Sequence, residues 1–178
     1  MILSRRWRHP AAVIGLMVLE FCLTVPILAL FGIASPDLYR TKLWEDGADN
    51  GFNSSPQTLV YAAANYRPMD VPDVWSQFTT NFNLVISVLS TFILLTKSVM
   101  FIMHTFIPLI SLLSHALLVA LYAVSVRYQT APDTNDPDHP QNGPPWYITK
   151  DCGVASDPNN VGYCKQAKTA FILTCLML

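Results

Sequence analysis

Two long apolar tracts and a short third one constrain most strongly what this chain can fold into. The first tract covers residues 11–34, the second covers residues 82–126, and the third begins at Thr169 and reaches Leu178. One helical crossing of a bilayer needs about 20 apolar residues. The tracts therefore predict one span, then two consecutive spans, and the beginning of a fourth. We expect an all-α membrane protein, a four-transmembrane-helix bundle.

Composition supports this class. The chain is 52% hydrophobic and only 13% charged, which is typical of a membrane protein. Its net charge of −1 provides no electrostatic basis for binding nucleic acid. Outside the tracts the chain is polar and rich in proline, so no sizeable water-soluble core is expected there. We predict a single membrane domain over residues 1–178, with the lipid bilayer as its main partner and with itself or other membrane proteins as further partners.

Charge along the chain predicts its orientation. Arg5, Arg6 and Arg8 precede the first span, and the positive-inside rule places that end in the cytoplasm. We expect spans at about residues 11–33, 82–102 and 107–127, a fourth span starting at about residue 168, and outer loops at 35–80 and 128–167. A cleaved signal peptide is the alternative for the first tract, but the tract is longer than usual and contains Glu20.

The third tract is too short for a complete crossing. At helical rise it reaches only about 15 Å, half of a bilayer. We interpret it as a truncated fourth helix.

The expected location of the protein is the plasma membrane or a membrane of the secretory pathway.

Capping signals predict short helices in the first outer loop. Ser35-Pro36 and Ser55-Pro56 each combine an N-cap residue with proline at the first helical position. Gly47 is the expected stop of the first of these helices. Pro72-Asp73 is expected to start the helix that continues into the second span. The second outer loop, rich in Pro, Asp, Asn and Gly, is predicted to be a turn-rich surface linker.

Aromatic residues collect in the predicted outer loops. They are compatible with anchors at the level of the lipid headgroups or with cores of the loops. The residues concerned are Trp44, Trp75, Trp146 and Tyr147.

Two cysteines in the second outer loop predict a disulfide. Cys152 and Cys164 lie on the expected external side, where the compartment is oxidising, and free thiols are the alternative. Two cysteines supply only half of a tetrahedral zinc site. Cys22 and Cys175 lie in spans, where we expect small core residues.

Two other polar features of the loops carry weaker signals. Asn53 begins an Asn-X-Ser glycosylation sequon, which the nearby Pro56 weakens. Asp136, Asp138 and His139 are close in sequence, but their spacing matches no known ligand pattern. We expect a solvated acidic turn there, and neither a metal site nor a cofactor.

Three ionisable residues lie within the predicted spans. A charge near the bilayer centre costs at least about 2.5 kcal/mol unless it is paired. Counted at helical rise, Glu20 and His115 reach similar depths, and Lys97 lies about 6 Å closer to the cytoplasm. A contact of Glu20 with His115 or with Lys97 is therefore feasible. The cluster is interpreted as a polar clamp between helices, with a proton or ion relay as the alternative.

Small and hydroxyl residues form stripes on the second and third spans. Such stripes allow helices to approach closely and to exchange hydrogen bonds in lipid, so they indicate packing rather than a pore. The stripes are Asn83, Ser87, Ser90 or Thr91, and Ser98 on the second span, and Ser111, Ser114 with His115, and Ser125 on the third.

Three stretches of the outer loops carry a resemblance. They are Ser35-Pro36-Asp37-Leu38-Tyr39-Arg40, Ala64-Asn65-Tyr66-Arg67-Pro68 and Gly143-Pro144-Pro145-Trp146-Tyr147. They resemble an uncharacterised family of four-span integral membrane proteins from filamentous fungi. That resemblance implies a full-length fourth span and a cytoplasmic tail, but no activity. The overall topology is also similar to MARVEL-type four-span proteins, some of which carry a cysteine pair in the second outer loop.

These observations predict a non-enzymatic integral membrane protein that organises membrane or cell surface through its outer loops. The alternative is a small transporter or channel subunit that uses Glu20, Lys97 and His115 as a polar path.

Overall fold

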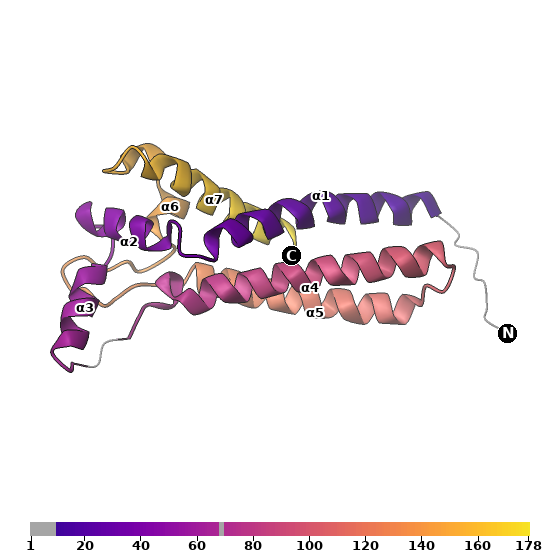
Figure 1. Cartoon of the computed structure of the whole chain (residues 1–178), viewed down its shortest axis with the longest axis horizontal. Coiled ribbons are helices and arrows are strands. Elements are labelled where there is room, and N and C mark those ends of the chain that lie inside the picture. Colours follow the sequence, from indigo (N-terminus) through magenta and orange to yellow (C-terminus); the bar gives the residue numbers. More distant parts are fainter. Residues whose placement is uncertain (1–9, 68–69) are drawn as a thin grey trace.

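A computed structural model describes residues 10–67 and 70–178 of the chain (Figure 1). Within these ranges it has no strands, and its only bridge joins Asp133 to Gln141. The all-α prediction is confirmed. The basic residues Arg5, Arg6 and Arg8 lie outside the described residues. The elements in chain order are α1 (Pro10–Ala34), α2 (Arg40–Asp49), α3 (Pro56–Ala64), η1 (Asp73–Trp75), α4 (Gln77–Ile102), α5 (Pro108–Gln129), α6 (Trp146–Thr149), η2 (Cys152–Val154) and α7 (Asn160–Leu176).

Three helices among the described residues are long and apolar enough to cross a bilayer. They are α1, α4 and α5, with mean hydropathies of 2.4, 2.1 and 2.1 over their candidate spans. In Figure 1 they run along the long axis of the molecule. α4 begins at Gln77, five residues before the predicted start of the span, because the hydroxyl of Ser76 accepts a hydrogen bond from the amide of Phe78 at 3.1 Å.

The fourth predicted span differs from expectation. α7 begins at Asn160 rather than near residue 168, so its first two turns lie in the segment expected to be loop. It packs against α1 and α5 near the outer ends of these helices (Figure 1). α7 is not among the helices that meet the length and hydropathy of a span.

The outer loops fold together into one unit, which we call the cap and define as residues 35–67, 70–76 and 130–159. Its core is aromatic, contrary to the prediction that the non-span segments bury little. Trp44 and Trp75 stack with ring centroids 5.9 Å apart, and Tyr147 packs edge-on against Trp75 at 6.0 Å. Trp146 donates a hydrogen bond from Nε1 to the carbonyl of Leu43 at 2.9 Å. The loop tryptophans are therefore core residues of the cap.

One of the two predicted start signals for short helices is correct. Ser55 caps α3 by accepting a hydrogen bond from the amide of Gln57, and Pro56 occupies the first helical position. Ser35-Pro36 does not start a helix. The chain turns at Asp37, whose φ is 56°, and α2 begins at Arg40. The Asp37 carboxylate accepts a hydrogen bond from the amide of Thr41 at 3.2 Å. It therefore satisfies one of the amide groups in the first turn of α2 that have no partner within the helix.

Two further predictions about the first loop are wrong in detail. α2 continues past Gly47 to Asp49, so Gly47 is not a stop. A Cβ at Gly47 would lie 1.9 Å from Asn53 Oδ1 and 2.6 Å from Trp146 Cδ1, so this glycine permits close packing. Pro72-Asp73 starts only the short helix η1, and the extended backbone of Ser76 separates η1 from α4.

Buried carboxylates join the two loops, which makes the second loop more than a surface linker. Asp133 is fully buried and accepts hydrogen bonds from the amide and hydroxyl of Ser54 at 3.2 Å and 2.7 Å. Asp46 accepts from the Ser156 amide at 2.7 Å and from Asn160 Nδ2 at 2.8 Å. Each carboxylate uses neutral donors from the other loop. The relative position of the loops is therefore set by charge-assisted hydrogen bonds.

The predicted disulfide is present. Cys152 and Cys164 are bonded, with their Cα atoms 5.7 Å apart. The bond links η2 in the cap to α7, and both cysteines are buried within the aromatic core. The second loop is thus covalently closed at the point where it enters the last helix.

Candidate functional site

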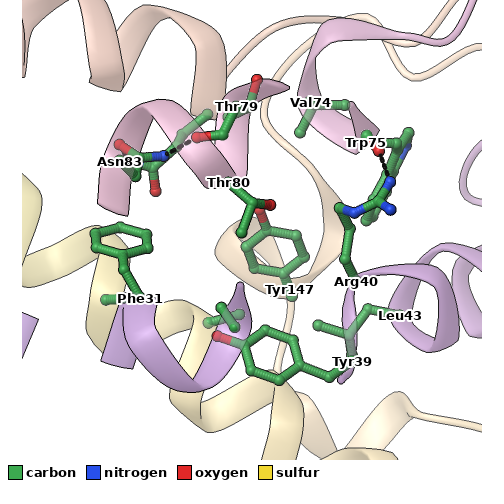
Figure 2. Close-up of a pocket in the computed structure, with 14 residues that line it drawn as sticks. Phe31, Tyr39, Arg40, Leu43, Val74, Trp75, Thr79, Thr80, Asn83 and Tyr147 are labelled. Carbon is green, nitrogen blue, oxygen red and sulfur yellow. Dashed lines mark hydrogen bonds between the residues drawn. The ribbon is translucent and has the colours of Figure 1, made fainter. Parts of the chain in front are cut away.

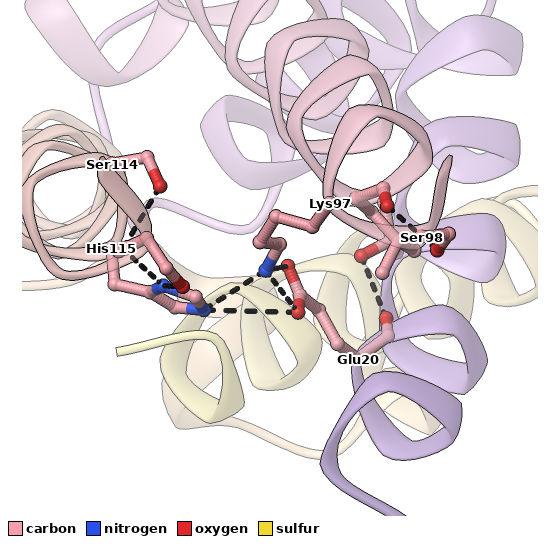
Figure 3. Close-up of polar contacts among 8 residues, drawn as sticks. Glu20, Lys97, Ser98, Ser114 and His115 are labelled. Atoms are coloured by element: carbon pink, nitrogen blue, oxygen red, sulfur yellow. Dashed lines mark hydrogen bonds and ion pairs between the residues drawn. The ribbon is translucent and has the colours of Figure 1, made fainter. Parts of the chain in front are cut away.

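The three ionisable residues predicted within the spans meet in one cluster between three helices (Figure 3). Lys97 on α4 places Nζ 2.7 Å and 2.6 Å from the two carboxylate oxygens of Glu20 on α1. Nζ also lies 3.0 Å from Nε2 of His115 on α5. We call Glu20, Lys97 and His115 the ionic cluster. Of the two contacts that the sequence suggested, Glu20–Lys97 is made directly, and His115 Nε2 lies 3.8 Å from Oε2 of Glu20. The contact between Lys97 and His115 was not predicted.

The contacts of His115 indicate its tautomer. Nδ1 lies 2.7 Å from the carbonyl oxygen of Ser111, one turn earlier in α5, so Nδ1 carries the proton and donates it to that carbonyl. Nε2 then has a free lone pair that accepts a hydrogen bond from Lys97. All three ammonium protons of Lys97 have acceptors, two from Glu20 and one from His115.

Burial makes this pairing important for stability. The side chains of Lys97 and Glu20 are 8% and 15% exposed, whereas that of His115 is 48% exposed. A single unpaired charge at this depth would cost about 2.5–3.5 kcal/mol on insertion scales. Because the ammonium and carboxylate neutralise one another and come from different helices, the ionic cluster holds α1, α4 and α5 together.

A groove beside the ionic cluster opens to the side of the helices. Its volume is about 360 Å³, and His115 and Glu20 line it together with residues near the turn between α4 and α5. Most of its wall is hydrocarbon, from Val13, Leu16, Met17, Phe106, Pro108 and Leu112. The exposed part of His115 therefore faces an apolar groove that leads toward the expected cytoplasmic end.

A second polar network lies nearer the cap and links α4, α5 and α7. Ser125 donates to Oδ1 of Asn83, and Gln129 Nε2 lies 2.9 Å from Ser125 Oγ and 3.4 Å from Thr174 Oγ1. All four side chains are buried. The sequence stripes included Asn83 and Ser125 but missed Gln129, which lies just beyond the second apolar tract, and Thr174, which lies in the short third tract.

The two polar centres belong to one continuous contact line between α4 and α5. On α4, Asn83, Ser90 and Lys97 are spaced by heptads, and on α5 the same spacing runs in the opposite direction through Gln129, Tyr122 and His115. Antiparallel helices with this spacing pair residue by residue along a seam. The contacts Lys97–His115 at 3.0 Å and Asn83–Gln129 at 3.4 Å fix the register at both ends. Heptad spacing of polar residues, continued from the apolar tract to Gln129 just beyond it, was the signal that would have found Tyr122 and Gln129.

A small cavity lies between this seam and the cap (Figure 2). Its volume is about 60 Å³, and α1, α2, η1, α4, α5, α6 and α7 all contribute to its wall. Tyr147 stands near its centre, between Thr80 and Tyr39 (Figure 2). Burial raises the pKa of Tyr39 to about 12 and raises that of Tyr147 as well. Both phenols therefore remain protonated at physiological pH and are available as donors.

Other predicted residues have different environments from those expected. Asn53 is 1% exposed, and its Nδ2 donates to the carbonyls of Trp44 and Ser54 at 3.0 Å and 2.8 Å, so this fold has no room for a glycan there. Cys22 and Cys175 are exposed on their helices, not buried in the core. Asp136 and His139 contact one another at 3.3 Å on a turn at the surface of the cap.

Comparisons with known proteins give limited information. No family model matches the chain, and no solved structure matches it. A curated relative, "Kojic acid related protein 1" of the fungus Aspergillus oryzae, is 48% identical over 95 residues. The aligned part covers 53% of this chain but only 38% of that protein. The chain therefore spans less than two fifths of the relative's length, and the relative's name states no activity.

Proposed function

We propose that this chain is a non-enzymatic integral membrane protein that organises a membrane or cell surface through its outer loops. The observation that carries the proposal is the cap. Both outer loops share one aromatic core, exchange hydrogen bonds through Asp46 and Asp133, and are closed by the disulfide between Cys152 and Cys164. Loops that only connect spans need none of these features. A rigid cap presents a fixed surface to partners.

The proposal includes a topology. The amino-terminal end is cytoplasmic and the cap faces outward, at the plasma membrane or in the secretory pathway. The basic residues before the first span and the disulfide, which persists in oxidising compartments, support this orientation. α7 forms the outer part of a fourth span, as in MARVEL-type proteins. Its position against α1 and α5 supports this arrangement.

The contact surface that we propose lies around α3. Val60 and Tyr61 on this helix are 68% and 70% exposed, and Tyr66 just after it is 97% exposed. α3 extends sideways from the cap beyond the helices (Figure 1). Large apolar side chains gathered on a rigid external helix are typical of a protein contact. The partner is a second copy of this chain or another membrane protein with an apolar external surface.

Energy transfer between fluorescently labelled copies in a cell membrane tests self-association. Replacing Val60, Tyr61 and Tyr66 together by Ser should lower the transfer efficiency at equal expression. Val154→Ser is the matched control, because Val154 is an exposed cap residue, at 41%, away from α3. Equal transfer efficiency in both variants, together with unchanged capture of other membrane proteins by crosslinking, would exclude α3 as the contact surface.

A further inference from the structure

The seam between α4 and α5 is polar along most of its length. Continuing the register set by Lys97–His115 and Asn83–Gln129 places the seam residues at five levels. From the cap inward the levels are Asn83 with Gln129, Ser87 with Ser125, Ser90 with Tyr122, Leu94 with Leu118, and Lys97 with His115. Except for His115, these residues are all at most 6% exposed. Small and hydroxyl residues are common where helices pack in a bilayer, so the series by itself indicates packing.

The middle level carries the strongest indication of a role beyond packing. The Ser90 and Tyr122 hydroxyls face one another, and among the described residues neither makes a hydrogen bond of standard geometry or has any other polar partner. A buried polar group without a partner costs about 1–3 kcal/mol, which is a reason to expect an apolar residue in its place. A hydroxyl both donates and accepts, so it can pass a proton along a chain of waters. These two groups lie between the ionic cluster and the Asn83–Gln129 contact.

Both ends of the seam lead to open space. At the inner end, Lys97 and His115 line the apolar groove of about 360 Å³. At the outer end, Asn83 and Gln129 line the cavity of about 60 Å³ beneath the cap, with Thr79 and Thr80 on the same wall (Figure 2). The cavity is large enough for water, which requires about 10–15 Å³ and a few polar partners.

One level interrupts the polar series. Leu94 and Leu118 are 3% and 4% exposed, and they separate the ionic cluster from Ser90 and Tyr122. Seven residues of helix separate adjacent heptad positions by about 10 Å, which is too far for direct proton transfer. An apolar constriction of this kind excludes water and closes a pathway until it is hydrated.

We propose that the seam is a pathway for protons and water between the inner groove and the cavity beneath the cap, closed at rest by Leu94 and Leu118. When the leucine level is hydrated, water connects the ionic cluster to Tyr122 and Ser90. From there the network of Ser125, Asn83 and Gln129 leads to the cavity. The proton is the transported species because, apart from Leu94 and Leu118, the seam between the ionic cluster and the cavity is lined by hydroxyl and amide groups, which suit a hydrogen-bonded chain.

Proton flux into vesicles tests the proposal. The purified full chain is reconstituted into liposomes that contain a pH-sensitive dye, and a potassium gradient with valinomycin drives protons inward. Leu94→Ser should raise the proton flux at least tenfold over the wild type, because it places a polar side chain in the apolar constriction and allows water to enter it. Leu95→Ser is the matched control, since Leu95 is the next residue and is 57% exposed on the outside of α4. It should leave the flux unchanged.

A second change separates a pathway from a general leak. Tyr122→Phe removes only the hydroxyl, so in the Leu94→Ser background it should lower the flux at least fivefold without lowering the melting temperature. If Leu94→Ser does not reconstitute as a folded protein, Leu118→Ser makes the same level polar from α5. A flux for the folded serine variant within twofold of Leu95→Ser overturns the proposal. So does a flux that Tyr122→Phe leaves intact. Neither result bears on self-association through α3.

Discussion

The ammonium of Lys97 lies within 2.7 Å of both carboxylate oxygens of Glu20, and this ion pair joins α4 to α1 inside the apolar part of the bundle. Glu20 is the only acidic residue in α1. Lys97 is the only charged residue in α4. Each therefore depends on the other for neutralisation, with His115 providing the remaining acceptor for the ammonium.

The first prediction concerns this ion pair. Glu20→Gln should lower the free energy of unfolding by about 3–5 kcal/mol, because it leaves the Lys97 charge buried without its counterion. Lys97→Met in the same background should restore part of the loss. A double-mutant cycle on the purified protein in detergent measures the coupling. Additive effects of the two substitutions would contradict a clamp between α1 and α4.

The second prediction concerns close packing in the cap. Gly47→Ala should destabilise the cap by about 1–3 kcal/mol, because the new Cβ would overlap Asn53 Oδ1 and Trp146 Cδ1. Gly162→Ala in α7 is the control, since no atom lies within 4 Å of a Cβ at that position. Alanine has the higher helix propensity, so the control should melt at the same temperature or higher. Intrinsic tryptophan fluorescence reports the unfolding of the cap.

The third prediction concerns the disulfide. Cys152→Ser should destabilise the cap by about 3 kcal/mol in the chain-entropy model of loop closure. Trypsin should then cleave faster after Lys150 and Lys165, which flank the closed loop. Cys22→Ser, on the exposed face of α1, is the control and should leave the digestion rate unchanged. Identical digestion of all three proteins would show that the bond does not hold the second loop in place.

The fourth prediction concerns Asn53. Because its side chain is buried and both Nδ2 protons are donated to carbonyls, the folded protein should carry no glycan there. Treatment of the protein from a eukaryotic host with an endoglycosidase should leave its electrophoretic mobility unchanged. A mobility shift that Asn53→Gln abolishes would show that the sequon is used and that the cap packs differently around residue 53.

The predicted spans agree closely with α1, α4 and α5, because length and hydropathy are local properties of a segment. The Ser55-Pro56 start signal also depends on neighbouring residues only, and it is correct. Ser35-Pro36 and Gly47 carry equally clear local signals, and both predictions are wrong. In each case a contact with a distant segment overrides the local preference: Arg40 donates to the Trp75 carbonyl, and Trp146 packs against Gly47.

For the ionic cluster, depth along each span could be counted from the sequence, so Glu20, Lys97 and His115 were expected near one another. The count could not tell whether Glu20 contacts Lys97 or His115, because both lie within reach of it along the spans. Tyr122 and Gln129 were missed. A tyrosine within an apolar helix and a glutamine at its end are both common when that helix is considered by itself. Their position in the seam can be recognised only when α5 is placed in register against α4.

The sequence alone indicated the all-α class of this protein, three helices long and apolar enough to cross a bilayer, the disulfide and the candidate ionic residues, since each depends on the hydropathy, spacing or chemistry of short segments. Only the tertiary structure decided that the outer loops form one cap around buried tryptophans, that Lys97 stands between Glu20 and His115, and that α4 and α5 meet along a polar seam. These features join residues that are far apart in the chain. Their positions follow from packing and from the need to pair buried polar groups, which no single segment specifies.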